Sequence, residues 1–237
     1  TTDVGAVDPL DEVGAVAERH GLWHHVDAAY GGFFLLVDEM RPKLAGIARS
    51  DSVILDPHKT LFLPYGSGAV LVRDREAMRR AHGFRAAYLQ DAAAAESADA
   101  PSPAELAPEL TKPFRGLRLW LALKVHGLAP FRAALEEKLW LARYAYEELR
   151  RLGFEVGPEP ELSVVAFRWV PRRGDPDAFN RRLLDAIHRD GRIFVSSTTL
   201  DGRFMLRLAI VVFRTHLETI DLALQLLSAK IAELQRE

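Results

Sequence analysis

Residues 51–74 read DSVILDPHKTLFLPYGSGAVLVRD, and this stretch combines two short apolar runs with a loop that carries a lysine. The runs SVIL and SGAVLV have the length and the β-branched composition of buried strands. Lys59 follows Pro-His just after the first run ends. A solvated loop residue is the ordinary interpretation of such a lysine, whereas an amine used in covalent chemistry needs supporting residues elsewhere in the chain.

The residues before this stretch predict a helix and a further strand. Asp8-Pro9 is typical of a helix start, with Asp8 as the cap, and Gly21 is typical of a helix end. The letters WHHVDAAYGG then predict a strand that ends at Asp27 before a glycine turn. This order of helix and strands indicates an α/β fold. Because residues 1–75 hold too few strands for a complete doubly wound sheet, we expect the second half of a larger domain.

The rest of the chain predicts a long loop followed by alternating helices and strands. Residues 90–113 contain four prolines and many alanines, which is typical of a linker or of a lid over an active site. Apolar residues three and four positions apart predict the helices that follow, and Thr215 with Glu218 forms a capping-box pattern before the last one. The runs LSVVAFRWV, RIFVSS and RFMLRLAIV predict strands between these helices.

Composition excludes several classes of protein. The 237 residues are 49% hydrophobic and 27% charged, as in globular proteins, and a net charge of −2 does not indicate nucleic acid or an anionic membrane as a partner. No apolar run approaches the ~18 residues of a membrane span, and no signal-peptide pattern is present, so we expect a cytoplasmic protein. Without cysteine there are no disulfides. The eight histidines lack metal-binding spacing, so no metal is expected.

Asp27 and Lys59 are the two candidates for chemistry. Both follow predicted strands, and ligands bind at the carboxyl ends of strands in α/β sheets. A carboxylate and an amine at this edge could form a simple salt bridge. They would also suit pyridoxal phosphate, which needs a lysine for a Schiff base and an acid that keeps its pyridine nitrogen protonated. The small residues after Asp27 leave room for a flat ring.

Several motifs in the same order resemble the pyridoxal-phosphate-dependent group II amino-acid decarboxylases, a family that includes aromatic-amino-acid, glutamate and cysteine-sulfinate decarboxylases. These motifs are HVDAAYGG, DPHK, the opening TT…AVDPL and the later FRGLRLWLALKVHG. The resemblance implies the α/β fold type I of pyridoxal enzymes, which is aspartate-aminotransferase-like, and a homodimer with active sites at the subunit interface. Because these enzymes are much longer, it also implies that an N-terminal half is missing. Residues 1–115 would then complete the cofactor-binding large domain, and residues 116–237 would form the small α/β domain.

The resemblance also implies roles for individual residues. Lys59 would hold the cofactor as a Schiff base, and Asp27 would pair with the pyridinium nitrogen. Ala29 would pack on the cofactor ring, His58 would lie beside it, and Thr2 would contact it. The catalytic residues implied in this way are Lys59, His58 and one tyrosine farther along the chain.

Four further positions follow from the same resemblance. Asp56 stands where many members have Asn near the phosphate, a position in which a carboxylate is unfavourable unless it is hydrogen-bonded. Tyr88 matches the tyrosine of a mobile catalytic loop, here residues 84–113, that protonates the α-carbon after carbon dioxide leaves. Arg115 matches a structural arginine at the domain junction, and Thr60 replaces a frequent Trp.

The implied activity is decarboxylation of an L-amino acid to an amine and carbon dioxide. The substrate branch stays open, because the residues that separate the branches lie largely in the missing half. Two alternatives also stay open: a non-catalytic fragment or interaction module that keeps the dimer surface, and an oxidative enzyme of the aldehyde-synthase type. Those synthases resemble the decarboxylases but typically have Phe at the loop position, so Tyr88 favours decarboxylation.

Overall fold

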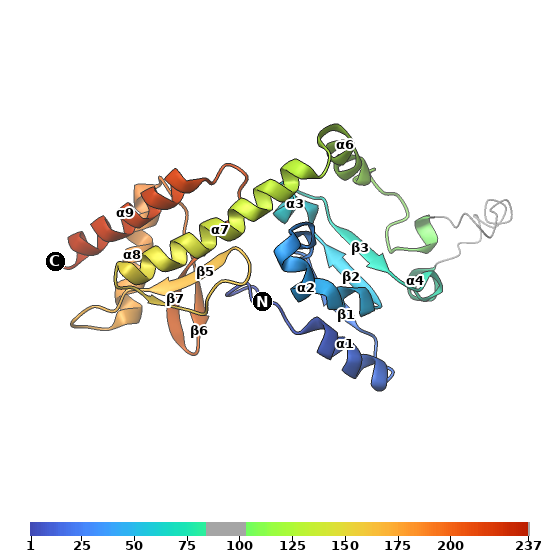
Figure 1. The fold of residues 1–237 in the computed structure, drawn as a ribbon, viewed down its shortest axis with the longest axis horizontal. Coiled ribbons are helices and arrows are strands. Elements are labelled where there is room, and N and C mark those ends of the chain that lie inside the picture. Colours follow the sequence, from blue (N-terminus) through green and yellow to red (C-terminus); the bar gives the residue numbers. More distant parts are fainter. Residues whose placement is uncertain (84–102, 237) are drawn as a thin grey trace.

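The computed structural model describes residues 1–83 and 103–236, which form two lobes, one around each of two sheets (Figure 1). In chain order, with 3₁₀ helices written η, the elements are α1 Leu10–Arg19, β1 His25–Asp27, η1 Gly32–Leu36, η2 Asp38–Met40, α2 Arg41–Leu44, η3 Ala45–Arg49, β2 Ser52–Leu55, α3 Pro57–Thr60, β3 Ala69–Val72, α4 Arg75–His82, η5 Pro103–Glu105, α6 Gly116–His126, α7 Ala129–Arg151, β4 Glu155–Val156, β5 Val164–Arg168, α8 Pro176–Asp190, β6 Ser196–Leu200, β7 Arg203–Ala209 and α9 Leu217–Leu234.

The N-terminal lobe holds a three-stranded sheet in the order β1-β2-β3. Strands β1 and β2 are parallel, and Asp27 lies opposite Ile54, whereas β3 runs antiparallel to β2. The apolar runs SVIL and SGAVLV thus form strands, as predicted. Because β1 and β2 are parallel, their carboxyl ends lie at the same edge of the sheet. This edge carries Asp27 on one strand and α3, with Lys59, directly after the other.

The core of the N-terminal lobe lies between the sheet and the helices around it. It also includes two residues of α7, which reaches in from the other lobe. The buried members are Leu10, Val26, Ala28, Phe34, Val37, Met40, Leu44, Leu135, Leu139 and Leu162.

The C-terminal lobe holds a four-stranded antiparallel sheet in the order β4-β5-β7-β6. The predicted alternation along β7 and the residue after it is confirmed, since Phe204, Leu206, Leu208 and Ile210 are all buried. These side chains share one hydrophobic cluster with residues of α7, α8 and α9.

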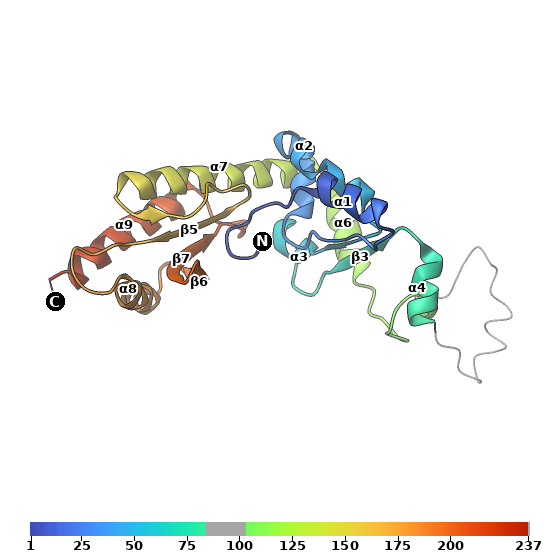
Figure 2. The same cartoon turned by 90° about the horizontal axis from the view of Figure 1, so that it is seen from below.

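Helix α7 runs from one lobe to the other (Figures 1 and 2). Leu135 and Leu139 near its start belong to the N-terminal cluster, whereas Leu141 and Leu149 belong to the C-terminal cluster. The two lobes therefore share one helix.

The lobes also meet at the start of the chain. There Thr198 donates to the Asp3 carboxylate, and Arg207 donates to the carbonyl of Thr2. The domain boundary at residue 115 stays a prediction.

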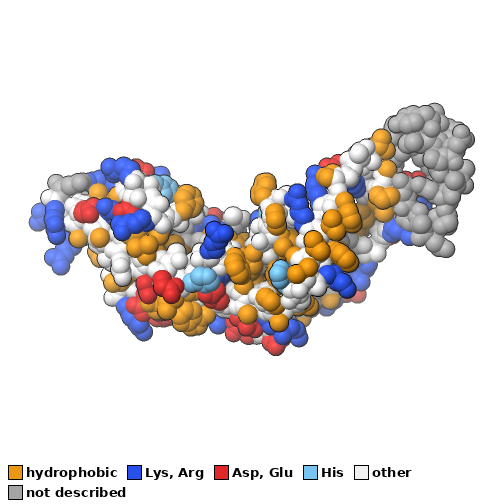
Figure 3. Space-filling model, turned by 90° about the horizontal axis from the view of Figure 1, so that it is seen from above, with side chains coloured by type: hydrophobic (Ala, Val, Ile, Leu, Met, Phe, Trp, Pro, Cys, Tyr) orange, Lys and Arg blue, Asp and Glu red, His pale blue; other side chains and the backbone are white. Residues whose placement is uncertain are grey.

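Helix α6 presents its apolar residues to solvent. Leu117, Trp120, Leu121 and Val125 are all at least 43% exposed. Figure 3 shows hydrophobic side chains at the surface of the N-terminal lobe. Within the described ranges, no helix has the length and hydropathy of a membrane span, and no group of three or more His, Asp or Glu side chains is arranged to hold a metal ion.

Candidate active site

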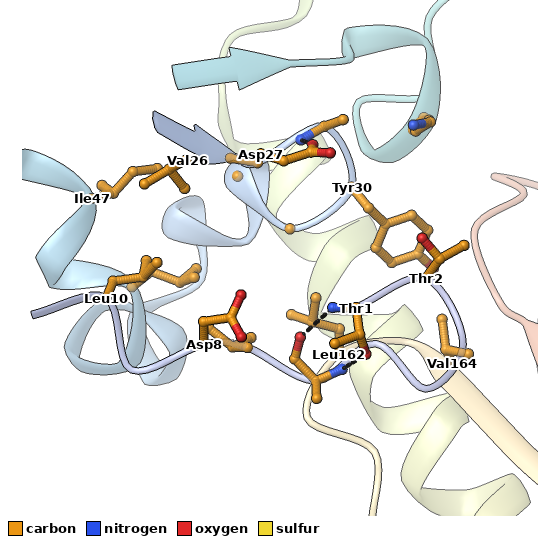
Figure 4. Close-up of a pocket in the computed structure, with 18 of the residues that line it drawn as sticks. Thr1, Thr2, Asp8, Leu10, Val26, Asp27, Tyr30, Ile47, Leu162 and Val164 are labelled. Carbon is orange, nitrogen blue, oxygen red and sulfur yellow. Dashed lines mark hydrogen bonds between the residues drawn. The ribbon is translucent and has the colours of Figure 1, made fainter. Parts of the chain in front are cut away.

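A cavity of about 540 Å³ opens between the two lobes (Figure 4). The N-terminal turn, the end of β1 and the turn of α3 contribute to its wall from one lobe. Leu162, Val164 and Arg207 contribute from the other lobe. The cavity thus lies at the sheet edge where the sequence predicts a ligand, and the C-terminal lobe closes one side of it.

Asp27 and Lys59 both line this cavity. Asp27 is the last residue of β1, and its carboxylate accepts a hydrogen bond of 3.1 Å from the backbone N–H of Ala29. Ala29 is itself buried and also lines the cavity. A carboxylate, a small side chain and an amine therefore line the same space, and Thr2 lines it as well.

The turn that carries Lys59 is well defined by its sequence. Pro57 occupies the first turn of α3, where its missing N–H leaves no partner unsatisfied. The buried Thr60 donates a hydrogen bond of 2.9 Å from its hydroxyl to the carbonyl of Tyr30. This bond joins the turn after β2 to the segment after β1. Thr60 therefore attaches the turn of Lys59 to the segment after β1, and the expected departure from a frequent Trp at this position stays a prediction.

The two neighbours of Lys59 that the resemblance singles out do not line the cavity. The Asp56 carboxylate lies 2.9 Å from the Lys59 ammonium. The His58 ring has its Nδ1 2.7 Å from the carbonyl oxygen of Ser67 and meets the ring of Tyr65 edge-on. Both residues hold the turn in place, and their roles toward a cofactor stay predictions.

Arg207 lies in none of the family motifs quoted above, and Tyr30 lies in HVDAAYGG but was given no role there; both line the cavity. The Arg207 guanidinium donates to the carbonyl oxygen of Thr2 at 3.0 Å and to the Ser196 hydroxyl at 3.3 Å. The Tyr30 hydroxyl lies 2.7 Å from the Ser163 hydroxyl, and burial raises the pKa of Tyr30 above 10.0. The one available signal for Arg207 was a charged residue between two leucines of a predicted strand.

Two predicted residues stand apart from the cavity. Tyr88 lies outside the described residues. Arg115 directly precedes α6 and forms an exposed ion pair with Glu109, with 3.7 Å between the charged atoms. Its predicted place at a domain junction stays a prediction.

The residues of the cavity fit pyridoxal phosphate. At the shared sheet edge the cavity is lined by the Lys59 amine and the Asp27 carboxylate, while Asp8 adds a second carboxylate elsewhere on the lining. Ala28 and Ala29 are small, buried residues beside Asp27. This is the donor set that the cofactor needs, namely an amine for its aldehyde and an anion for its pyridinium.

Comparisons with known proteins agree with this fit. A family model described as "Pyridoxal-dependent decarboxylase conserved domain" matches residues 1–170. The chain is 32% identical over 223 residues to the aromatic-L-amino-acid decarboxylase of Bacillus atrophaeus, covering 92% of this chain and 46% of that protein. It is 38% identical over 192 residues to the cysteine sulfinic acid decarboxylase of Mus musculus, covering 77% and 38%. A phenylacetaldehyde synthase of Arabidopsis thaliana is 31% identical over 89% of this chain and 44% of its own length.

Solved structures show the same fold. The Oryza sativa protein TDC, solved with PLP and tryptamine, superposes with a TM-score of 0.88 at 29% identity, over 99% of this chain and 49% of that one. The expected fold type I is confirmed by this likeness. The chain spans about half the length of the relatives that it matches. It belongs to the family of pyridoxal-dependent decarboxylases.

Proposed function

We propose that this chain is the C-terminal part of a pyridoxal-phosphate-dependent enzyme that converts an L-amino acid to an amine and carbon dioxide. The observation that carries the proposal is that Asp27 and Lys59 line one cavity from the ends of neighbouring parallel strands. Family membership supports it. The longer enzyme, its homodimer and its cytoplasmic location are parts of the same proposal.

The residues at the sheet edge would hold the cofactor. Lys59 supplies the amine that binds its aldehyde, Asp27 keeps a proton on its pyridine nitrogen, and Ala29 lies against its ring. Thr2, His58 and Asp56 belong to the same site in this proposal. When bound, pyridoxal phosphate supplies the electron sink that allows the bond between the α-carbon and the carboxylate to break.

Arg207 would bind the carboxylate of the amino acid. It lines the cavity from the C-terminal lobe, and guanidinium groups match the planar geometry of carboxylates. Its hydrogen bonds to Thr2 and Ser196 hold it in a fixed direction. The C-terminal lobe would then orient the substrate, while the N-terminal lobe holds the cofactor.

Two other functions compete with this one. A relative named phenylacetaldehyde synthase matches at an identity similar to that of the decarboxylases, so oxidation to an aldehyde is an alternative reaction. Tyr88 argues against it, because the resemblance implies Phe at this position in such synthases. A non-catalytic fragment or interaction module is the second alternative, since the chain spans only part of its relatives.

One experiment separates these functions. The longer enzyme that contains this chain is loaded with pyridoxal phosphate and incubated with a panel of aromatic, acidic and sulfinate amino acids. We expect an absorbance band at about 420 nm, typical of cofactor bound to a lysine, together with release of amine and carbon dioxide. Lys59→Ala should abolish the band and the turnover. Aldehyde with peroxide would support the oxidative alternative, and a missing band would support the non-catalytic one.

A further inference from the structure

Phe62 has an unusual backbone conformation three residues after Lys59. Its φ of 58° lies in the left-handed region, which is uncommon for a residue with a large side chain. Its N–H closes the turn by donating to the carbonyl oxygen of Lys59 at 3.2 Å. Such a conformation persists only where the surroundings hold it. Whatever fixes Phe62 therefore also fixes the backbone of Lys59.

The surroundings of Phe62 include a residue of the other lobe. The ring of Phe213 packs on the ring of Phe62 with 5.7 Å between the centroids and an angle of 59° between the planes. Phe213 lies in the loop between β7 and α9, and it is 57% exposed. A half-exposed ring adds little to a core, so its contact with Phe62 calls for another explanation.

The loop that presents Phe213 is held by a buried lysine. Lys138 on α7 is 1% exposed, and its ammonium donates to Glu137 at 2.8 Å, to the carbonyl of Phe213 at 3.4 Å and to the carbonyl of Thr215. These three acceptors match the three donors of an ammonium group. Burial of the charge is unfavourable without these partners, so the backbone around Phe213 is held in one arrangement.

Glu137 connects a further residue of this loop to α7. Its carboxylate lies 2.7 Å from Nδ1 of His216, in addition to its bond with Lys138. Burial alone would raise the pKa of Glu137, but the bonds from Lys138 and His216 lower it below 4.5. The loop is thus attached to α7 through Phe213, Thr215 and His216.

We propose that Phe213 is a positioning residue for Lys59. Its ring packs on Phe62 and so fixes the backbone that carries Lys59, and Lys138 in turn holds the loop of Phe213 in place. The C-terminal lobe then sets the direction of the amine that binds the cofactor, although it contributes no atom to that bond. This inference rests on the proposed function in one respect, namely that Lys59 is the residue to which the cofactor is attached.

The test uses the longer enzyme in its cofactor-free form. Pyridoxal phosphate is added, its attachment to Lys59 is trapped over time with borohydride, and the modified peptide is quantified by mass spectrometry. Visible circular dichroism of the bound cofactor reports its orientation, and the melting temperature of the cofactor-free protein reports stability. The variants are Phe213→Ala, Phe213→Tyr and Lys138→Met. Phe194→Ala is the matched control. Phe194 is an exposed aromatic residue of the same lobe (79% exposed), but its ring stacks on His188 and not on Phe62.

We expect Phe213→Ala to slow attachment roughly two- to tenfold, the range that loss of one aromatic pair produces in an equilibrium. It should also weaken the dichroism without lowering the melting temperature. Phe213→Tyr should restore both, and Lys138→Met should reproduce both defects. Unchanged attachment and dichroism in Phe213→Ala, or an equal effect of Phe194→Ala, would overturn this inference but leave the proposed function standing. Failure of the unaltered enzyme to be labelled at Lys59 would overturn the proposed function instead.

Discussion

The carboxylate of Asp56 lies 2.9 Å from the ammonium of Lys59, and the two side chains belong to the same short turn after β2. Lys59 is 41% exposed and Asp56 is 15% exposed, so the pair is open to solvent on one side. In the proposed function, the ammonium would have to separate from this carboxylate and lose a proton before it attacks an aldehyde. The pair therefore directs the lysine side chain but opposes its reaction.

We expect Asp56→Asn to accelerate attachment of pyridoxal phosphate to Lys59 by roughly two- to fivefold, since a partly exposed ion pair contributes only about 0.2–1 kcal/mol. The rate is measured by borohydride trapping at neutral pH and at two salt concentrations. Asp38→Asn is the control, because Asp38 forms an exposed pair with Arg41 at 3.1 Å. Equal rates in the Asp56 variant and the unaltered enzyme would contradict this prediction.

Asp27→Ala should lower turnover by about a hundredfold or more, since loss of a preorganised charge partner commonly has an effect of this size. The melting temperature of the cofactor-free protein should change little, because Asp27 accepts a hydrogen bond only from a neighbouring residue among the described ones. Asp8→Asn is the control, as Asp8 lines the same cavity on the side opposite Asp27 (Figure 4). Activity within about threefold of the unaltered enzyme would overturn the role of Asp27.

Tyr88→Phe should shift the product from amine toward aldehyde. A tyrosine phenol, with an ordinary pKa of about 10, is protonated at neutral pH and can donate a proton to the α-carbon. Without this donor, the substrate carbon stays electron-rich for longer. Oxygen can then take two electrons from it and leave as peroxide, and water hydrolyses the resulting C=N bond to aldehyde and ammonia. Amine and peroxide are measured in parallel under air. Unchanged amine without peroxide would identify Tyr88 as an ordinary surface residue.

Gly46→Ala should destabilise the N-terminal lobe by about 1–3 kcal/mol, the usual effect of overpacking. A Cβ at this position would lie 2.3 Å from the backbone nitrogen of Asp11 and 2.6 Å from the carbonyl carbon of Leu10, and the backbone cannot yield as a side chain can. Thermal unfolding of the cofactor-free protein measures the effect. Gly116→Ala is the control, since its Cβ would meet its nearest atom at an ordinary 3.8 Å. Equal melting temperatures for the two variants would show that η3 moves away from α1 without strain.

Glu155 should make the stability of the C-terminal lobe depend on acid pH. Burial alone would raise the pKa of Glu155, but hydrogen bonds and charge from Arg168 and Arg203 lower it below 4.5. Because the pKa is lower in the folded state, this stabilisation is complete above the unfolded value and is lost as the pH falls through the folded one. Urea unfolding across this range should give a shallower pH dependence for Glu155→Gln. Glu147→Gln, which alters an exposed pair with Arg150, should not change the slope; equal slopes for both variants would contradict the prediction.

The features nearest to the cavity were largely predictable from local patterns. The runs SVIL and SGAVLV form β2 and β3, and β1 ends at Asp27 as expected. Strand composition and the turn residues at the ends of a strand are local signals, so a single sequence is enough to recognise them. The shared edge of Asp27 and Lys59 then follows from the parallel pairing of their strands.

Helix starts and the far wall of the cavity were not predictable in the same way. Helix α1 begins at Leu10 with Pro9 at the cap position, so the predicted cap by Asp8 is wrong. Helix α9 has His216 at its cap position and no side-chain cap, so the predicted capping box of Thr215 and Glu218 is also wrong. The carbonyl of Thr215 instead accepts a hydrogen bond from Lys138. The place of Arg207 depends on how the lobes meet, which no local pattern contains.

Helix α7 has a consequence for how this chain folds. Leu135 and Leu139 are fully buried in one cluster, and Leu141 and Leu149 are fully buried in the other. If either lobe unfolded, part of α7 would lose the side chains that pack against it. A helix is stabilised in water mainly by such packing. We therefore expect the two sheets to unfold together, so that damage to strands far from the cavity would also disturb the lysine that lines it.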